Sequence, residues 1–156
     1  MTAVESVVGI IIVDHGSRKD ASNQMLHDAV EIFRRTYGHQ IVEPAHMELA
    51  QPDIATAFQR CVQQRATRII VFPYFLSPGR HWSEDIPTLV REAATNYPMV
   101  EWMVTAPFGL HPQMSDIIQD RIDHCVQAAQ SAEPVDCDVC DGTQCQLRTG
   151  GPGGQL

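Results

Sequence analysis

Short apolar runs alternate with longer amphipathic stretches along most of the 156-residue chain. The first run, residues 7–13, is apolar throughout, which is typical of a strand covered on both faces of a sheet. The runs that follow it are also short enough to be strands, although Pro44 weakens the second one. The pattern therefore predicts four strands, at residues 7–13, 40–49, 67–75 and 100–105.

Apolar side chains recur at helical spacing between these runs. The predicted helices cover residues 22–37, a segment that opens at Pro52, residues 83–97 and residues 112–130. Strands that alternate with helices predict an α/β fold, in which helices flank a mainly parallel four-stranded sheet. Residues 1–130 are expected to form this domain. The periodicity stops at Ser131, so residues 131–156 are expected to form a cysteine-bearing tail that ends in a flexible, disordered segment.

The composition narrows the possible partners. A formal net charge of −8 argues against a nucleic-acid partner, which favours a basic surface. No apolar run approaches the roughly 20 residues that span a membrane, and the N-terminal residues lack the basic flank of a signal peptide. The five cysteines are an odd number without signs of secretion, so a disulfide framework is not expected. We expect an intracellular protein without a membrane partner.

Three chemically active side chains stand at the ends of predicted strands. His15 and His81 follow the first and third strands, and Glu48 stands near the end of the second. Ligands of open α/β sheets bind beyond the carboxyl ends of the strands, so the three are expected on one rim. Imidazole and carboxylate suit a divalent metal ion and also proton abstraction near neutral pH. His15 or His81 alone could equally bond to the backbone, and Glu48 alone is more often only a carboxylate in the first turn of a helix. The coincidence of the three favours a site.

Two arginines lie beside these histidines in the sequence. Arg18 and Arg80 could receive carboxylates, because a planar guanidinium can bind two oxygens at once. The net negative charge does not prevent this, since the local field dominates at contact range. Ser17 and Ser77 belong to the same loops and could add hydrogen bonds to such a substrate.

Several motifs make the chain resemble a known family. It is similar to the short class II tetrapyrrole chelatases of the CbiX/SirB type, and most of all to the plant and cyanobacterial sirohydrochlorin ferrochelatases. The motifs are "DHGSR", "HMELAQPDIATAF", "PYFLSPGRHWSEDIP", "TAPFGLHP" and "DRIDHC", and the resemblance covers nearly the whole chain. The resemblance implies a one-lobed chelatase fold, a homodimer, and insertion of Fe²⁺ into sirohydrochlorin to form sirohaem. His15 and His81 match the family's active-site histidines and Glu48 its acidic residue, which implies catalytic and metal-binding roles.

The tail carries a second cluster of candidate ligands. Cys137, Cys140 and Cys145 follow a C-x2-C-x4-C spacing, which favours zinc or an iron–sulfur cluster. Cys125 is the best fourth ligand, because Cys61 lies in an amphipathic helix and is expected in the core. The resemblance to plant-type enzymes implies a [2Fe–2S] cluster, although the last spacing is one residue shorter than the family's. We expect it to regulate the enzyme, sense redox state or stabilise a dimer.

Other readings stay open at this point. A phosphohistidine hydrolase is disfavoured because Asp14, which repels phosphate, stands where such enzymes place an arginine. A cobalt or nickel chelatase of the same fold uses similar ligands, and a metal or iron–sulfur sensing module without catalysis is a non-enzymatic alternative. The expected location is the cytoplasm, or the plastid stroma if a transit peptide was removed.

Overall fold

The computed structural model describes residues 6–131 and 135–140. The chain divides into two compact units, Met1–Gly109 and Leu110–Leu156, and each is described by itself. Residues 1–5, 132–134 and 141–156 lie outside the described residues, and the predicted cluster ligand Cys145 is among them.

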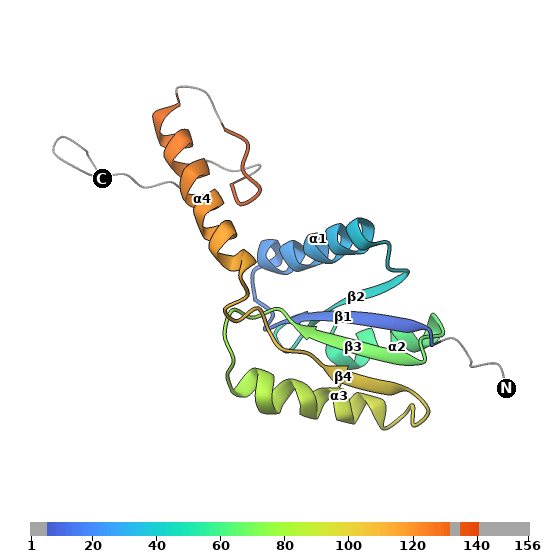
Figure 1. The fold of residues 1–156 in the computed structure, drawn as a ribbon. Helices are drawn as coiled ribbons and strands as arrows, with labels where there is room; N and C mark the ends of the chain where they lie inside the picture. The colour runs from blue at the N-terminus through green and yellow to red at the C-terminus, as the bar shows by residue number, and fades with distance from the viewer. Residues whose placement is uncertain (1–5, 132–134, 141–156) are drawn as a thin grey trace. The chain divides into compact units, whose positions relative to one another are not determined.

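The first unit is built on a parallel sheet. Its strands are β1 (Val8–Asp14), β2 (Ile41–His46), β3 (Arg68–Pro73) and β4 (Glu101–Val104), in the spatial order β2-β1-β3-β4 (Figure 1). All three pairings are parallel, so the predicted four-stranded sheet is confirmed. β2 stands at an edge, where a proline is tolerated because its missing N–H can face away from the sheet.

Helices cover both faces of this sheet (Figure 1). α1 (Asp20–Tyr37) lies on one face, and α2 (Ile54–Gln63) and α3 (Ile86–Ala94) lie on the other. Gly38 ends α1 in the left-handed conformation with φ 69°, directly after the predicted last residue of this helix. The alternation of helix and strand in the sequence is thus the alternation seen in the fold.

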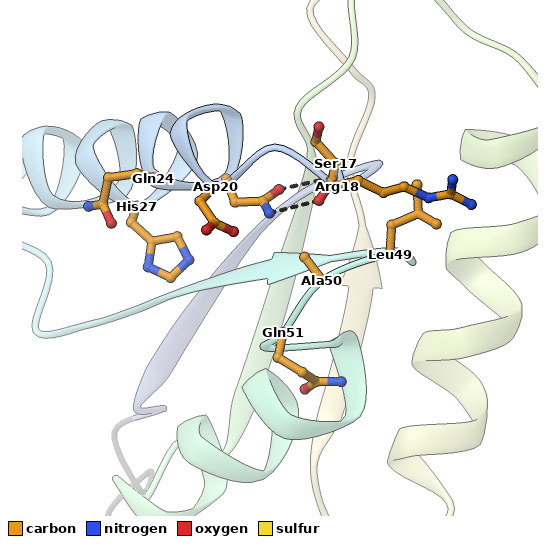
Figure 2. Close-up of a pocket in the computed structure, with 9 residues that line it drawn as sticks. Ser17, Arg18, Asp20, Gln24, His27, Leu49, Ala50 and Gln51 are labelled. Carbon is orange, nitrogen blue, oxygen red and sulfur yellow. Dashed lines mark hydrogen bonds between the residues drawn. The ribbon is translucent and has the colours of Figure 1, made fainter.

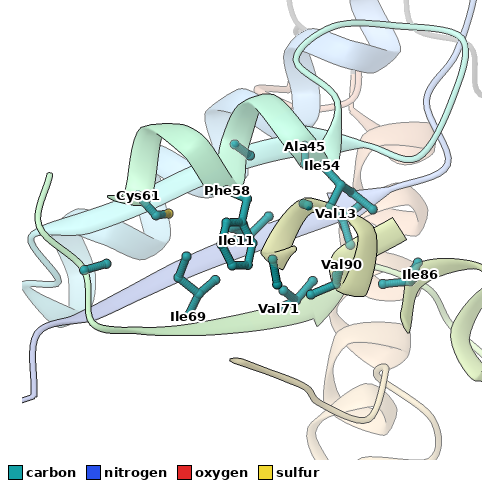
Figure 3. Packing of buried hydrophobic residues seen from close by; sticks show 14 of the residues in the cluster. Ile11, Val13, Ala45, Ile54, Phe58, Cys61, Ile69, Val71, Ile86 and Val90 are labelled. Atoms are coloured by element: carbon teal, nitrogen blue, oxygen red, sulfur yellow. The ribbon is translucent and has the colours of Figure 1, made fainter. Parts of the chain in front are cut away.

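Two apolar clusters hold these layers together. The larger one joins β1 and β3 to α2 and α3, and it includes Ile11, Val13, Phe58 and Val90 (Figure 3). The smaller one packs β1 and β2 against α1 through side chains that point to the other face. Cys61 is fully buried in the larger cluster, which confirms its expected place in the core. Burial raises the pKa of its thiol to about 12.

Two predicted boundaries were wrong, and both bear on the site. β2 ends at His46, so Glu48 belongs to the loop after the strand and not to the strand itself. A π-helical turn over His81–Asp85 precedes α3, so helical structure begins two residues before the predicted start at residue 83. Such turns are often found where a side chain has a functional orientation.

The second unit contains α4 (Gln113–Gln130), as predicted, and the described residues 135–140. Arg121 of α4 forms a bidentate ion pair with Asp138, with nitrogen–oxygen distances of 2.5 and 2.7 Å. The guanidinium lowers the pKa of the Asp138 carboxyl. None of the α4 residues is buried, and its larger apolar side chains, Ile117, Ile118, Ile122 and Val126, are exposed. Among the described residues, no helix is long and apolar enough to cross a membrane.

Candidate active site

Three loops meet at the carboxyl edge of the sheet. They follow β1, β2 and β3, which are adjacent and parallel, so their ends lie at the same edge. The first loop carries His15, the second carries Glu48, and the third leads into the helical turn that begins at His81. The sequence predicted this shared rim from the order of strands and polar residues.

His15 and Glu48 are in direct contact. The imidazole Nε2 lies 2.7 Å from the carboxylate Oε1 of Glu48, and the other ring nitrogen lies 3.2 Å from the backbone oxygen of Gly16. Both ring nitrogens of His15 therefore face oxygen acceptors. The two side chains are 40% and 54% exposed, so a large substrate can reach them from solvent.

His81 approaches this pair from the other side of the rim. Its ring centroid lies 5.2 Å from that of His15, with the rings inclined by 67°. Asp85 accepts a hydrogen bond from the His81 Nδ1 at 2.7 Å when that nitrogen carries the proton. A carboxylate in this position fixes the ring orientation and leaves Nε2 as the nitrogen available to a ligand. The ring of Phe75 stacks behind His81 at 6.3 Å.

The three side chains do not stand as a preformed metal cage. Among residues 6–131 and 135–140, no three histidine, cysteine or acidic side chains are close enough to hold a metal ion as they lie. His15 and Glu48 instead hydrogen-bond to each other, and a metal ion bound at either of these two atoms would replace that contact. The assignment of His15, Glu48 and His81 as ligands stays a prediction that this proximity permits.

A shallow cavity of about 420 Å³ adjoins the His15 loop (Figure 2). Ser17 and Arg18 line it together with Leu49 and residues of α1. The Ser17 Oγ accepts a hydrogen bond from the Lys19 N–H at 3.0 Å, and the Ser17 N–H donates to the Asn23 side chain. Ser17 therefore shapes the loop, whereas the exposed guanidinium of Arg18 extends past Leu49 in Figure 2.

The loop after β3 carries the other two predicted substrate contacts. Ser77 and Arg80 are both exposed. The Arg80 Nε lies 3.4 Å from a carboxylate oxygen of Glu84, which is a long contact on the surface. Such a pair contributes little stability and can be exchanged for a substrate carboxylate, so the predicted roles of both residues stay open to test.

Sequence reasoning missed three residues that touch the rim. Asp85 lies one helical turn after His81, and that i, i+4 spacing was the available signal. Asp14 and His46 form a contact across β1 and β2 that only the strand register reveals. His46 is the last residue of β2 and is fully buried, whereas Glu48, two residues later, lies in the following loop.

Two of the cysteines of the second unit lie together. The Cys140 N–H bonds to the Cys137 carbonyl at 3.2 Å, which closes a tight turn. Backbone N–H groups of Cys140 and Val139, in that order of effect, lower the pKa of the Cys137 thiol. A thiolate stabilised in this way is suited to bind a metal or cluster iron. Cys125 lies on α4 and is partly buried.

Comparison with known proteins gives one family and several relatives. The family model named CbiX matches residues 9–125. The chain is 50% identical over 140 residues to the chloroplastic sirohydrochlorin ferrochelatase of Arabidopsis thaliana, and the match covers 89% of this chain and 62% of that protein.

Two solved structures resemble the fold. The structure of SirB from Bacillus subtilis with Fe³⁺ matches with a TM-score of 0.71 at 30% identity, over 74% of this chain and 46% of that one. The sirohydrochlorin chelatase SirB of Bacillus subtilis subspecies spizizenii, in complex with cobalt, matches with a TM-score of 0.67 at 30% identity, over 74% of this chain and 50% of that one. The chain thus spans about half the length of these bacterial relatives and less than two thirds of the plant one.

Proposed function

The chain belongs to the CbiX family, and on that premise we propose that it is a sirohydrochlorin ferrochelatase, which inserts Fe²⁺ into sirohydrochlorin to form sirohaem. The observation that carries this proposal is the meeting of His15, Glu48 and His81 at one open edge of the sheet. The similarity to the plant enzyme selects the macrocycle and the metal among the reactions that such a site supports.

The reaction requires proton acceptors next to a metal-binding group. One Fe²⁺ replaces two pyrrole N–H protons, so both protons must leave the ring for charge to balance. We assign one proton to the Nε2 of His81, because Asp85 engages the other nitrogen. The second goes to the His15–Glu48 pair, which can share the added proton between imidazole and carboxylate. Imidazole and carboxylate both bind ferrous iron, so the same groups can position the ion.

The flat macrocycle is expected to lie across this rim with its carboxylates on the flanking loops. Arg18 and Arg80 are exposed on opposite loops and are our proposed carboxylate contacts. Ser77 adds a hydroxyl from the second loop, and Ser17 contributes mainly by shaping the first. Binding a distorted ring in preference to a flat one would favour the transition state, since a flat ring hinders metal entry.

Cobalt insertion is the alternative reaction, and it is supported by the structure of a related chelatase in complex with cobalt. The donor set does not separate iron from cobalt or nickel strongly. The test is an anaerobic reaction of the full chain with sirohydrochlorin and each metal ion in turn, followed by the absorption of the macrocycle. The proposal predicts the highest kcat/KM with Fe²⁺; a higher value with Co²⁺ would assign the chain to the alternative.

We further propose that residues 1–130 are the chelatase domain and that two copies form a homodimer. The exposed apolar side chains of α4 and the half-length match to bacterial relatives support this proposal. Ile118→Glu is expected to shift the sedimentation coefficient from dimer to monomer, whereas the control Gln119→Glu should leave it unchanged. A monomeric wild-type chain at micromolar concentration would contradict the dimer.

We also propose a [2Fe–2S] cluster with Cys125, Cys137, Cys140 and Cys145 as ligands and residues 131–156 as the segment that carries it. The stabilised thiolate of Cys137 beside Cys140 fits this group, and Arg121 offsets negative charge near Cys137 and Cys125. When bound, the cluster would supply one-electron redox chemistry. Cys140→Ser should abolish the visible absorption of the cluster and leave metal insertion intact; colourless wild-type protein after anaerobic reconstitution would contradict the proposal.

The location follows from the same relatives and is also a proposal. The plant enzyme is named as chloroplastic, which supports the plastid stroma for this chain, with the cytoplasm as the alternative. A fluorescent fusion of the full coding sequence in its native cell distinguishes the two compartments.

A further inference from the structure

A buried histidine lies directly behind the candidate site. His46 is fully buried, and its Nδ1 lies 2.6 Å from the Oδ1 of Asp14. Its other ring nitrogen has no hydrogen-bond partner among the described residues. The ring of His27 stacks on it at 5.6 Å. Burying an imidazole with one nitrogen unpaired costs stability that an apolar residue would not cost, so its presence calls for an explanation.

The partner of His46 holds the site loop as well. Asp14 is the residue before His15, and the same Oδ1 that faces His46 accepts the Gly16 N–H at 2.9 Å. The same carboxylate oxygen of Asp14 therefore contacts Gly16 in the first loop and His46 at the end of β2. Asp14 and His46 are register partners at the last position of the β1–β2 pairing.

Backbone hydrogen bonds continue this connection to the active residues. The Met47 N–H donates to the Asp14 carbonyl at 2.8 Å, and the Glu48 N–H donates to the His15 carbonyl at 3.0 Å. The two loops thus run beside each other up to the point where His15 meets Glu48. Any change in the spacing of Asp14 and His46 is transmitted along this ladder to the pair.

The two loops also touch closely. Gly16 has φ +86°, and a Cβ at this position would lie 1.9 Å from the Glu48 carbonyl oxygen. The loops therefore approach as near as backbone atoms allow, so the His15–Glu48 distance has little freedom to adjust by itself. A bond that fixes the base of both loops consequently fixes that distance.

We propose that Asp14 and His46 are positioning residues, which set the geometry of the His15–Glu48 pair for metal binding. This inference rests on the proposed function, because it gives those two side chains a metal ion to receive. Neither Asp14 nor His46 contacts substrate in this account. Residues that orient metal ligands in this way typically change metal affinity or activity by about 10–100-fold when they are replaced.

The test compares three replacements of His46 in the full chain. His46→Leu removes the donor to Asp14 and fills the space with carbon. His46→Asn places an amide N–H near the former Nδ1, and His46→Gln places its amide nearer the former Nε2. The dissociation constant for Co²⁺ alone is measured by calorimetry, and kcat and KM for iron insertion are measured separately.

The proposal predicts a pattern that a structural role would not produce. His46→Leu and His46→Gln should raise the dissociation constant for Co²⁺ by about 10–100-fold and lower kcat, with KM for the macrocycle little changed. His46→Asn should recover most of both losses. Val30→Ala, in the smaller core cluster, is the control for lost stability and should keep the wild-type dissociation constant.

Several results would overturn the proposal. Equal Co²⁺ affinity in the Asn and Gln variants would overturn it, even if the Leu variant failed to fold. A wild-type chain that binds no Co²⁺ would also overturn it. A wild-type chain that binds Co²⁺ with the predicted His46 dependence, yet inserts no metal into sirohydrochlorin, would reject the proposed function and retain the positioning role.

Discussion

The two sides of the rim are held in different ways. On the side of His15 and Glu48, backbone hydrogen bonds, a close glycine contact and the contact of Asp14 with buried His46 hold two loops against each other. On the other side, the His81 ring is held by one hydrogen bond to Asp85 within its own helical turn, and its side chain is 49% exposed.

The difference lies in how far each side depends on tertiary structure. Two hydrogen bonds connect the segment after β3 to the chain after β4. The Leu76 carbonyl accepts the Gly109 N–H at 2.9 Å, and the Trp82 indole donates to the Thr105 carbonyl. Ser77 to Arg80 between these points are exposed. We interpret the first side as a fixed reference and the second as the side that adapts to an entering ring.

The largest predicted effect comes from removing the side chains to which we assign the chemistry. His15→Ala and His81→Ala should each lower kcat for iron insertion by about 100-fold or more, because each removes a proposed proton acceptor and metal donor. Initial rates with sirohydrochlorin and Fe²⁺ measure this. A His81→Ala variant with wild-type activity would remove the second side of the rim from the mechanism.

Two glycines offer a direct comparison of the two sides. Gly16→Ala introduces a Cβ into contact with the Glu48 backbone at a left-handed φ, so it should lower the free energy of unfolding by at least about 1–3 kcal/mol and reduce activity. Gly79→Ala meets no atom within 4 Å among the described residues, so it should change stability by about 0.5 kcal/mol or less. Urea denaturation of both variants tests the difference; equal losses would contradict it.

A smaller effect is expected from the support of His81. Asp85→Asn keeps the shape of the side chain but weakens its hold on the Nδ1 proton, so kcat should fall by about tenfold with little change in thermal stability. Glu92→Gln, an exposed change on the following helix, is the matched control and should have no effect on kcat. Unchanged turnover in Asp85→Asn would show that the His81 ring needs no fixed orientation.

The smallest predicted effect concerns the helix that follows the Glu48 loop. Asp53 caps α2, and hydrogen bonds from the Thr56 hydroxyl and then its backbone N–H lower the pKa of the Asp53 carboxyl. Asp53→Ala should cost about 1 kcal/mol near neutral pH. Because the pKa of Asp53 is lowered in the folded state, its ionised carboxylate contributes its full stabilisation above the ordinary pKa of aspartate. This stabilisation is lost as the pH falls through the folded-state pKa. The difference from wild type should therefore vanish in acid; a constant difference from pH 7 to pH 2 would contradict this cause.

The fold and the rim were accessible from the sequence because both follow from periodicity. The alternation of strands and helices fixed the parallel sheet, and residues that follow adjacent parallel strands must share an edge, as His15 and His81 do. The contact between Asp14 and His46 was not accessible, because it depends on the register of β1 against β2 and on the turn that separates His46 from Glu48. The π-helical turn at His81 was also missed, because the five residues of the segment "HWSED" carry no apolar pattern that would separate it from an ordinary helix start.

The central claim is that this rim catalyses iron insertion. The most direct measurement is the anaerobic initial rate of sirohaem formation from sirohydrochlorin and Fe²⁺, compared with a protein-free solution and with the double variant His15→Ala/His81→Ala. The account predicts rapid conversion by the wild-type chain and a rate close to the protein-free rate for a folded double variant. A wild-type chain that gives no acceleration, or a double variant as fast as wild type, would contradict it.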